Sequence, residues 1–193
     1  MKTKIIVSAC LLGYECRYDA KSNKNDEVLA LANEYELVSV CPECFGGLPT
    51  PRPPAEIKNG RVINVNGEDV TDNFVLGAEQ TLYVAKECNA PCAVLKANSP
   101  SCGFGKIYDG SFTKTKIDAN GITAQLLYDN DIQIFTENEI RRLKNLYLLL
   151  ARINYNHIIV CFFQGGKENE KGITDYSLSC SYARRIHRLL KGK

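Results

Sequence analysis

The sequence predicts an α/β fold with a mostly parallel open sheet flanked by helices, and two observations support this prediction. Short, continuously apolar runs such as KIIVS at residues 4–8 are typical of strands that are buried on both faces. Segments with helical spacing separate these runs, and strands that alternate with helices form parallel sheets with right-handed crossovers. The expected arrangement is Rossmann-like (flavodoxin-like), followed by a C-terminal appendage.

Each expected element has its own signal. The predicted strands are residues 4–8, 36–40, 92–97 and 131–136. The predicted helices are residues 26–34, 72–86, 121–130 and 137–150. The helix at 72–86 has the clearest apolar face, with Thr71 or Asp72 as its N-cap. The Pro-rich stretch 48–57 cannot form a regular helix, so it is expected to cross the molecule as extended chain, and residues 61–67 alternate like one arm of a hairpin.

Length and charge predict the domain organisation. A chain of 193 residues, with 45% hydrophobic and 24% charged residues, is long enough for one domain with a substantial core. Residues 1–150 carry 16 basic and 19 acidic side chains, whereas residues 151–193 carry 8 and 3. We therefore expect a cysteine-rich α/β domain at 1–150 and a basic C-terminal tail at 151–193. The tail is an edge element of the fold, a partner-binding segment or a piece without function.

The sequence also indicates where the protein acts and on what. No apolar stretch approaches the roughly 20 residues needed to span a bilayer, and the basic N-terminus leads directly into a strand-like run. We expect a cytoplasmic protein with no membrane partner. No run of basic residues is longer than the pair Arg184–Arg185, and the net charge of +2 demands no nucleic-acid partner. A small-molecule substrate and a monomer or weak homodimer are expected.

The placement of the cysteines is the most informative feature of the chain. Cys10, Cys41 and Cys102 each come just past a predicted buried strand. If these strands are parallel, the three thiols meet at the carboxyl edge of the sheet, where open α/β sheets bind ligands. Both histidines, His157 and His187, lie in the tail, so a metal site in the main domain would be built from thiolates. Soft thiolate ligands favour an iron–sulfur cluster or zinc.

Two of the cysteine loops contain further reactive groups. Cys16 follows in the segment CRYD and offers a second thiol in the first loop. Cys41 and Cys44 have the C-x-x-C spacing of metal and redox sites. Glu43 lies between them and is a natural acid–base group, because no histidine is available in the main domain.

The third loop, SPSCGFG, is rich in small residues whose backbone N–H groups can donate to an anion or to cluster sulfur. Ser101 puts a hydroxyl group beside Cys102 in this loop. In contrast, Cys88 and Cys92 flank the start of a predicted strand and are expected at the opposite edge of the sheet. They are interpreted as structural residues, with a labile disulfide as the alternative.

Taken together, these motifs resemble the bacterial family that includes the 2-thiouracil desulfurases. SACLLG, CRYD, CPE with GGL and PRPPAEI, DVTDNF, LKANSPSCG and IYDGSF match it in this order, over about residues 3–147. The resemblance implies a [4Fe–4S] cluster held by three cysteines, with one iron open to take the thiocarbonyl sulfur of the substrate without net redox change. The residues that match the ligands are Cys10, Cys41 and Cys102, and those that match the polar catalytic positions are Glu43 and Ser101.

The resemblance leaves some assignments open. Cys16 also belongs to the recurring pattern, so it can replace one of the three ligands, and Cys44 stands where many relatives carry an apolar residue. Tyr18, Phe45 or Phe104 could stack on a base-like ring in a dry pocket. The expected activity is removal of sulfur from a thiolated nucleobase or a related thiocarbonyl compound. The alternatives are a zinc or thiol-redox protein and a carrier of persulfide sulfur.

Overall fold

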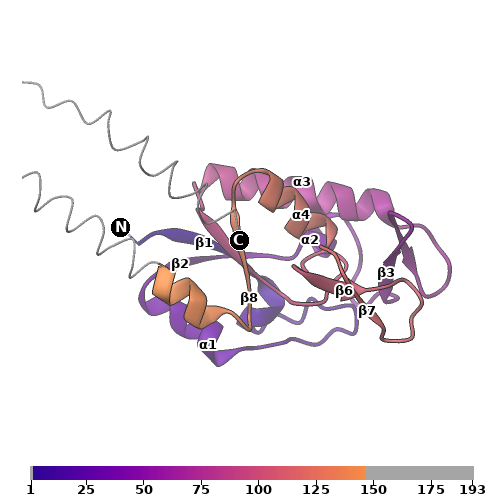
Figure 1. The fold of residues 1–193 in the computed structure, drawn as a ribbon, viewed down its shortest axis with the longest axis horizontal. Coiled ribbons are helices and arrows are strands. Elements are labelled where there is room, and N and C mark those ends of the chain that lie inside the picture. Colours follow the sequence, from indigo (N-terminus) through magenta and orange to yellow (C-terminus); the bar gives the residue numbers. More distant parts are fainter. Residues whose placement is uncertain (1, 147–193) are drawn as a thin grey trace, which may run out of the picture. The chain divides into compact units, whose positions relative to one another are not determined.

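The computed structural model describes residues 2–146, and Met1–Asn145 forms one compact unit. Within this part of the chain the central sheet has four strands, all parallel, in the order β2-β1-β5-β8 (Figure 1). The strands are β1 Lys4–Ser8, β2 Glu36–Val40, β5 Cys92–Leu95 and β8 Gln133–Thr136. The predicted α/β fold with a parallel sheet is confirmed. The predicted boundary near residue 150 and the tail at 151–193 lie outside the described residues.

Strand β1 is central because it pairs on both sides. Val7 aligns with Ser39 of β2 and with Val94 of β5. Ile5, Ile6 and Val7 are completely buried, as the continuous apolar run predicts for a strand covered on both faces. The chain therefore passes from β2 on one side of β1 to β5 on the other, and this reversal defines the switch point at which open α/β sheets bind ligands.

Helices cover both faces of the sheet (Figure 1). The longer helices, α3 (Thr71–Glu87) and α4 (Ile122–Asp129), pack together on one face. The other face carries α1 (Asp26–Leu29), which continues into the 3-10 turn η2 (Ala30–Asn33). Residues 140–146 are helical, so the predicted closing helix begins three residues later than the expected start at 137. Burial of the α3 side chain of Phe74, which is 1% exposed, contributes about 2 kcal/mol.

The predicted capping of α3 is wrong. Val70 occupies the N-cap position, and no side chain caps the helix there. The Thr71 hydroxyl instead accepts the N–H of Val62 at 2.9 Å and donates to Asp69 Oδ1 at 2.6 Å. Tertiary packing explains this difference, because β4, which contains Val62, lies against the start of α3 and its backbone N–H occupies the Thr71 hydroxyl.

Two antiparallel hairpins extend the unit at one end (Figure 1). One pairs β3 (Ala55–Lys58) with β4 (Arg61–Asn64), and the other pairs β6 (Lys106–Tyr108) with β7 (Lys116–Asp118). The Pro-rich stretch is therefore not all loop, because its last residues form β3 and pair with the predicted hairpin arm. Within residues 2–146, none of the helices is both long and apolar enough to cross a membrane.

Candidate functional site

A cavity of about 450 Å³ lies at the carboxyl edge of the sheet, next to the switch point. Four cysteines line it, and they come from the segments that follow β1, β2 and β5: Cys10, Cys16, Cys41 and Cys102. Cys10 and Cys102 are almost fully buried, at 9% and 6% exposure, whereas Cys16 and Cys41 are half-buried. The three predicted loops thus meet in one cavity, and Cys16 joins them.

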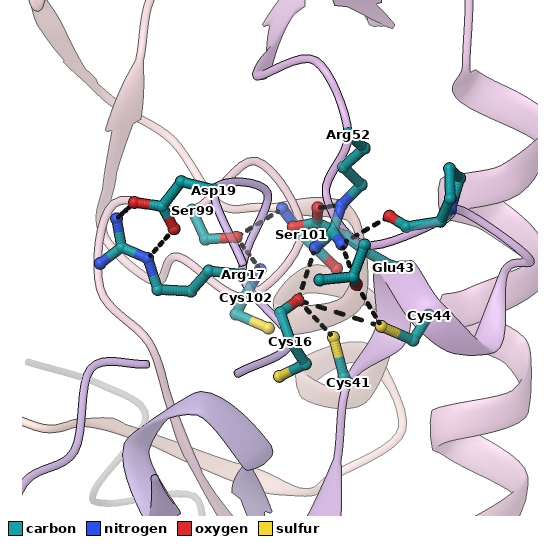
Figure 2. A network of polar contacts seen from close by, with 12 residues as sticks. Cys16, Arg17, Asp19, Cys41, Glu43, Cys44, Arg52, Ser99, Ser101 and Cys102 are labelled. Carbon is teal, nitrogen blue, oxygen red and sulfur yellow. Dashed lines mark hydrogen bonds and ion pairs between the residues drawn. The ribbon is translucent and has the colours of Figure 1, made fainter. Parts of the chain in front are cut away.

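The first loop is fixed by backbone hydrogen bonds around Cys10. This residue lies in the 3-10 turn η1 (Ala9–Leu12), directly after β1. Its carbonyl oxygen accepts the N–H of Asn23 at 2.9 Å, so the loop between them folds back over the strand end. Arg17 stabilises this loop through Asp19, whose two carboxylate oxygens lie 2.9 and 3.1 Å from the guanidinium (Figure 2). The guanidinium also donates to the side-chain oxygen of Asn23. Cys16 is consequently held on the cavity wall.

The second loop is the short helix α2 (Pro42–Phe45), which begins directly after Cys41. Helix α2 packs on α3 at Gly77, where an added Cβ atom would lie only 1.8 Å from the carbonyl oxygen of Pro42. A glycine inside a helix is normally unfavourable by about 1 kcal/mol relative to alanine. Its presence here is explained by the close approach of α2, which places Cys41 and Glu43 on the cavity.

The third loop is anchored on α4. The Ser99 hydroxyl accepts the N–H groups of Ser101 and Cys102 at 3.1 and 3.2 Å. Ser101 is completely buried, and its hydroxyl lies 2.8 Å from the Thr123 hydroxyl of α4. Cys102 lines the cavity but Ser101 does not, so the structure does not place the predicted serine among the cavity-lining groups.

The thiol groups of Cys41 and Cys44 both contact the backbone of Cys16 (Figure 2). The sulfur atoms of Cys41 and Cys44 lie 3.7 and 3.9 Å from the carbonyl oxygen of Cys16. Cys44 also lies 3.7 Å from the Thr50 hydroxyl, and it does not line the cavity. The fourth thiol on the cavity is therefore Cys16 and not the second cysteine of the C-x-x-C pair.

Crowding and burial disfavour the thiolate forms. The hydrogen bond with the Cys10 thiol is the largest influence on Cys16 and raises its pKa to about 11. The Cys16 thiol and then burial raise the pKa of Cys41 well above its ordinary value, and burial raises the pKa of Cys102 to about 12. Neutral thiols therefore suit the cavity as it stands. A cationic group bound between them would reverse this preference, because nearby positive charge favours thiolates.

A buried arginine connects the first two loops. Arg52 Nε donates to Glu43 Oε2 at 2.7 Å, and its Nη2 donates to the carbonyl oxygen of Cys16 at 3.0 Å. Its Nη1 donates to Pro49 O and Thr50 Oγ1, both at 3.1 Å. The side chains of Arg52 and Glu43 are only 4% and 19% exposed. Glu43 lines the cavity as predicted. Arg52 also lines it, and the sequence reasoning assigned this residue no role although it lies in the motif PRPPAEI.

A second ion pair connects the third loop to β8. Lys96 Nζ lies 2.6 Å from Glu137 Oε1, and the N–H of Ala97 donates to Glu137 Oε2 at 2.7 Å. Glu137 follows the end of β8, and Lys96 lines the cavity. This pair holds the start of the third cysteine loop at the sheet edge.

Of the three aromatic residues predicted to stack on the substrate, only Tyr18 lines the cavity. Tyr18 lines the cavity, and Tyr108 of β6 does so as well. Phe104 instead packs on Tyr128, with ring centroids 5.4 Å apart, and Phe45 is 41% exposed on the surface. Neither phenylalanine lines the cavity.

The donor set has a definite chemical character. Four thiols, with no imidazole among them, suit an iron–sulfur cluster or zinc. In the part of the chain that the structure describes, no group of three or more His, Cys, Asp or Glu side chains could hold a metal ion. A cluster is bound differently, because each thiolate binds a different iron and the sulfur atoms surround the cluster.

Comparison with known proteins supports this interpretation. The family model described as 2-thiouracil desulfurase matches residues 5–139, which include every cysteine on the cavity. The chain belongs to the 2-thiouracil desulfurase family. Cys88 and Cys92 also lie within the matched residues, but they are at the end of α3 and the start of β5, away from the carboxyl edge of the sheet, as predicted.

This chain is similar to one curated protein and to one solved structure. A protein from Bacillus subtilis (strain 168), described as "Uncharacterized protein YbbK", is 43% identical over 146 residues, which are 70% of this chain and 97% of that protein. A solved structure described as the "[4Fe-4S]-dependent thiouracil desulfidase TudS" matches with a TM-score of 0.73 at 43% identity. The match covers 77% of this chain and 99% of that structure.

Proposed function

We propose that this protein is a [4Fe–4S]-dependent desulfurase, an enzyme that removes sulfur from a thiolated nucleobase of the thiouracil type without net redox change. One observation carries the proposal: four thiols and the Arg52-bound carboxylate of Glu43 share a single cavity at the switch point of the sheet. Family membership and the similarity to the thiouracil desulfidase support the same activity.

Cys10, Cys41 and Cys102 are the proposed cluster ligands. They follow three different strands, β1, β2 and β5, and all three line the cavity. This arrangement suits an iron–sulfur cluster, which needs ligands on several sides. When bound, the cluster supplies a thiophilic iron that acts as a Lewis acid toward the thiocarbonyl sulfur. Cys16 remains next to the three ligands on the same cavity, where it can contact the substrate or take the place of one ligand.

Glu43 is the proposed acid–base group. Water must replace sulfur at the ring carbon, and a carboxylate at the cavity wall can accept the proton that this water loses. Arg52 holds Oε2 of Glu43 at 2.7 Å and is itself fixed by carbonyl oxygens, so the carboxylate has a defined position. Positioned groups of this kind are most effective when their geometry is set before the substrate arrives.

Ser101 does not line the cavity, so we propose that it acts through Cys102 and not by contact with the substrate. Its hydroxyl lies 2.8 Å from the Thr123 hydroxyl. Burial raises the pKa of the neighbouring Cys102 thiol, and the hydroxyl groups of Ser8 and then Ser101 partly oppose this increase. We assign Ser101 the role of orienting Cys102 from behind. Tyr18 and Tyr108 line the cavity and are the rings available to contact a planar base.

Anaerobic purification and turnover test the proposal. The protein should show the broad visible absorption of a [4Fe–4S] cluster, with about four iron and four sulfide per chain, the contents of one such cluster. It should release free sulfide from 2-thiouracil and form uracil in equal amount. A colourless zinc protein with full thiol-redox activity would contradict the proposal. Sulfur retained on the protein as persulfide, with no free sulfide, would favour a carrier instead.

We also propose the setting in which this enzyme acts. A small-molecule substrate fits a cavity of about 450 Å³. Thiol-ligated clusters require reduced cysteines, which supports a cytoplasmic enzyme. A monomer or weak homodimer without nucleic-acid or membrane partners completes this proposal, and size-exclusion chromatography of the purified protein tests the oligomeric state.

A further inference from the structure

Part of the cavity wall comes from the two hairpins and not from the cysteine loops. Pro54, Ala55 and Glu56 line it from the β3 segment, and Tyr108 and Lys114 line it from the β6–β7 hairpin. These hairpins are far apart in the sequence but lie at the same end of the unit (Figure 1). A side-chain contact joins the two hairpins at this wall.

That contact is made by Glu56, a carboxylate with 9% exposure. Its Oε2 accepts the N–H groups of Gly110 and Phe112, both at 3.0 Å. Hydrogen bonds to an ionised acceptor are roughly twice as strong as neutral ones, so this pair fixes the loop between β6 and β7 on β3.

The backbone of the loop is built for this contact. Gly110 has a φ of +87°, and an added Cβ atom would lie 2.7 Å from the carbonyl oxygen of Ile57 in β3. Phe112 and Lys114 also have positive φ values, 58° and 66°, which residues other than glycine rarely adopt. Such a conformation persists only where the surroundings impose it. Asp109 binds Ser111 within the loop, and Glu56 binds the loop from β3 at two points.

We infer that Glu56 is a positioning residue for substrate binding. It fixes the loop at residues 109–115 as the outer wall of the cavity and thereby presents Tyr108 and Lys114 to the part of the substrate remote from the thiocarbonyl group. This inference rests on the proposed function. Glu56 belongs to neither the cysteine loops nor the Arg52–Glu43 pair, so its contribution is to binding and not to the chemical step.

Two substitutions, one on each side of the contact, test the inference in the holoenzyme. Glu56→Ala removes the acceptor, and Gly110→Ala forces the loop away from β3. Each should raise KM for 2-thiouracil about tenfold and change kcat less than about twofold, the pattern expected when binding common to the ground and transition states is lost. Glu56→Gln keeps an acceptor oxygen and should restore most of the affinity. Cluster absorption should stay unchanged in all three variants.

Gly67→Ala is the matched control. Gly67 has a similar φ of +84° but no atom within 4 Å of an added Cβ, so this variant carries the backbone strain without the steric clash. Its KM should equal that of the wild type. Hydrogen exchange provides a readout that does not depend on activity: the amides of Gly110 and Phe112 should exchange at least about tenfold faster in Glu56→Ala.

The outcomes separate this inference from the proposed function. An active wild type whose KM is unaltered by both Glu56→Ala and Gly110→Ala overturns the inference alone. Unchanged amide exchange in Glu56→Ala overturns it as well, because the loop would then be held by other contacts. A wild-type holoenzyme that releases no sulfide from 2-thiouracil overturns the proposed function, and the inference with it.

Discussion

Arg52 Nε lies 2.7 Å from Glu43 Oε2, and the same guanidinium binds the carbonyl oxygen of Cys16 at 3.0 Å. One buried cation thus holds the carboxylate of the second cysteine loop and the backbone of the first. All of its nitrogen atoms have acceptors, since Nη1 binds Pro49 and Thr50. The position of Glu43 in the cavity therefore depends on a residue that comes from neither cysteine loop.

Replacing this arginine should reduce both stability and rate. Arg52→Met leaves the carboxylate of Glu43 and the carbonyl oxygen of Cys16 without their buried donor, which should lower the free energy of unfolding by about 3 kcal/mol. Arg52→Lys restores the charge but not the forked geometry, so it should recover stability better than rate. Urea denaturation and steady-state kinetics measure the two effects. Wild-type kcat in Arg52→Met would show that Glu43 needs no positioning.

Glu43→Gln should separate catalysis from cluster binding. The amide cannot accept a proton as a carboxylate does, so kcat should fall at least ~10²-fold, the usual scale for a positioned acid–base group. Glu43 is not a proposed ligand, and cluster absorption should therefore remain. In the Arg52→Met background the same substitution should cost much less, because the two residues act as one unit. Full activity of Glu43→Gln would remove Glu43 from the mechanism.

The three proposed ligands should be individually essential for the cluster. Cys10→Ala, Cys41→Ala and Cys102→Ala should each abolish the broad visible absorption and lower the iron content. Cys88→Ala and Cys44→Ala are matched controls, because neither thiol lines the cavity, and both should keep the cluster. A cluster that survives Cys102→Ala but is lost in Cys16→Ala would show that Cys16 is the third ligand.

The convergence of Cys10, Cys41 and Cys102 could be predicted because it depends on local patterns. Apolar runs define the strands, parallel pairing brings their carboxyl ends to one edge, and a thiol placed after each strand must lie there. Glu43 was accessible to the same reasoning, since it lies only two residues after Cys41 in the sequence.

The parts that could not be predicted depend on packing between distant segments. Arg52 reaches Glu43 only because the Pro-rich chain crosses the cavity, and Glu56 meets Gly110 only because two hairpins pack together. The Ser101 hydroxyl lies 2.8 Å from the Thr123 hydroxyl of α4, a contact between segments that the sequence pattern does not predict. Periodicity contains no information on such pairings, because each is decided by how whole elements dock.

Gly77 provides the sharpest test of how the second cysteine loop is built. Gly→Ala inside an exposed helix normally stabilises a protein by about 1 kcal/mol. At Gly77 the sign should reverse, because the added methyl group would lie 1.8 Å from the carbonyl oxygen of Pro42 and 3.1 Å from the backbone nitrogen of Gly46. Both atoms are backbone and cannot rotate away, so α2 must move off α3, and Cys41 and Glu43 must move with it. We expect Gly77→Ala to have a lower melting temperature, reduced iron content and slower sulfide release.

Ala78→Gly is a control for helix propensity on the same turn and should lower stability without loss of iron per folded chain. A Gly77→Ala protein that is more stable than the wild type and retains its full iron content would show that α2 does not need this close approach to hold Cys41 at the cavity.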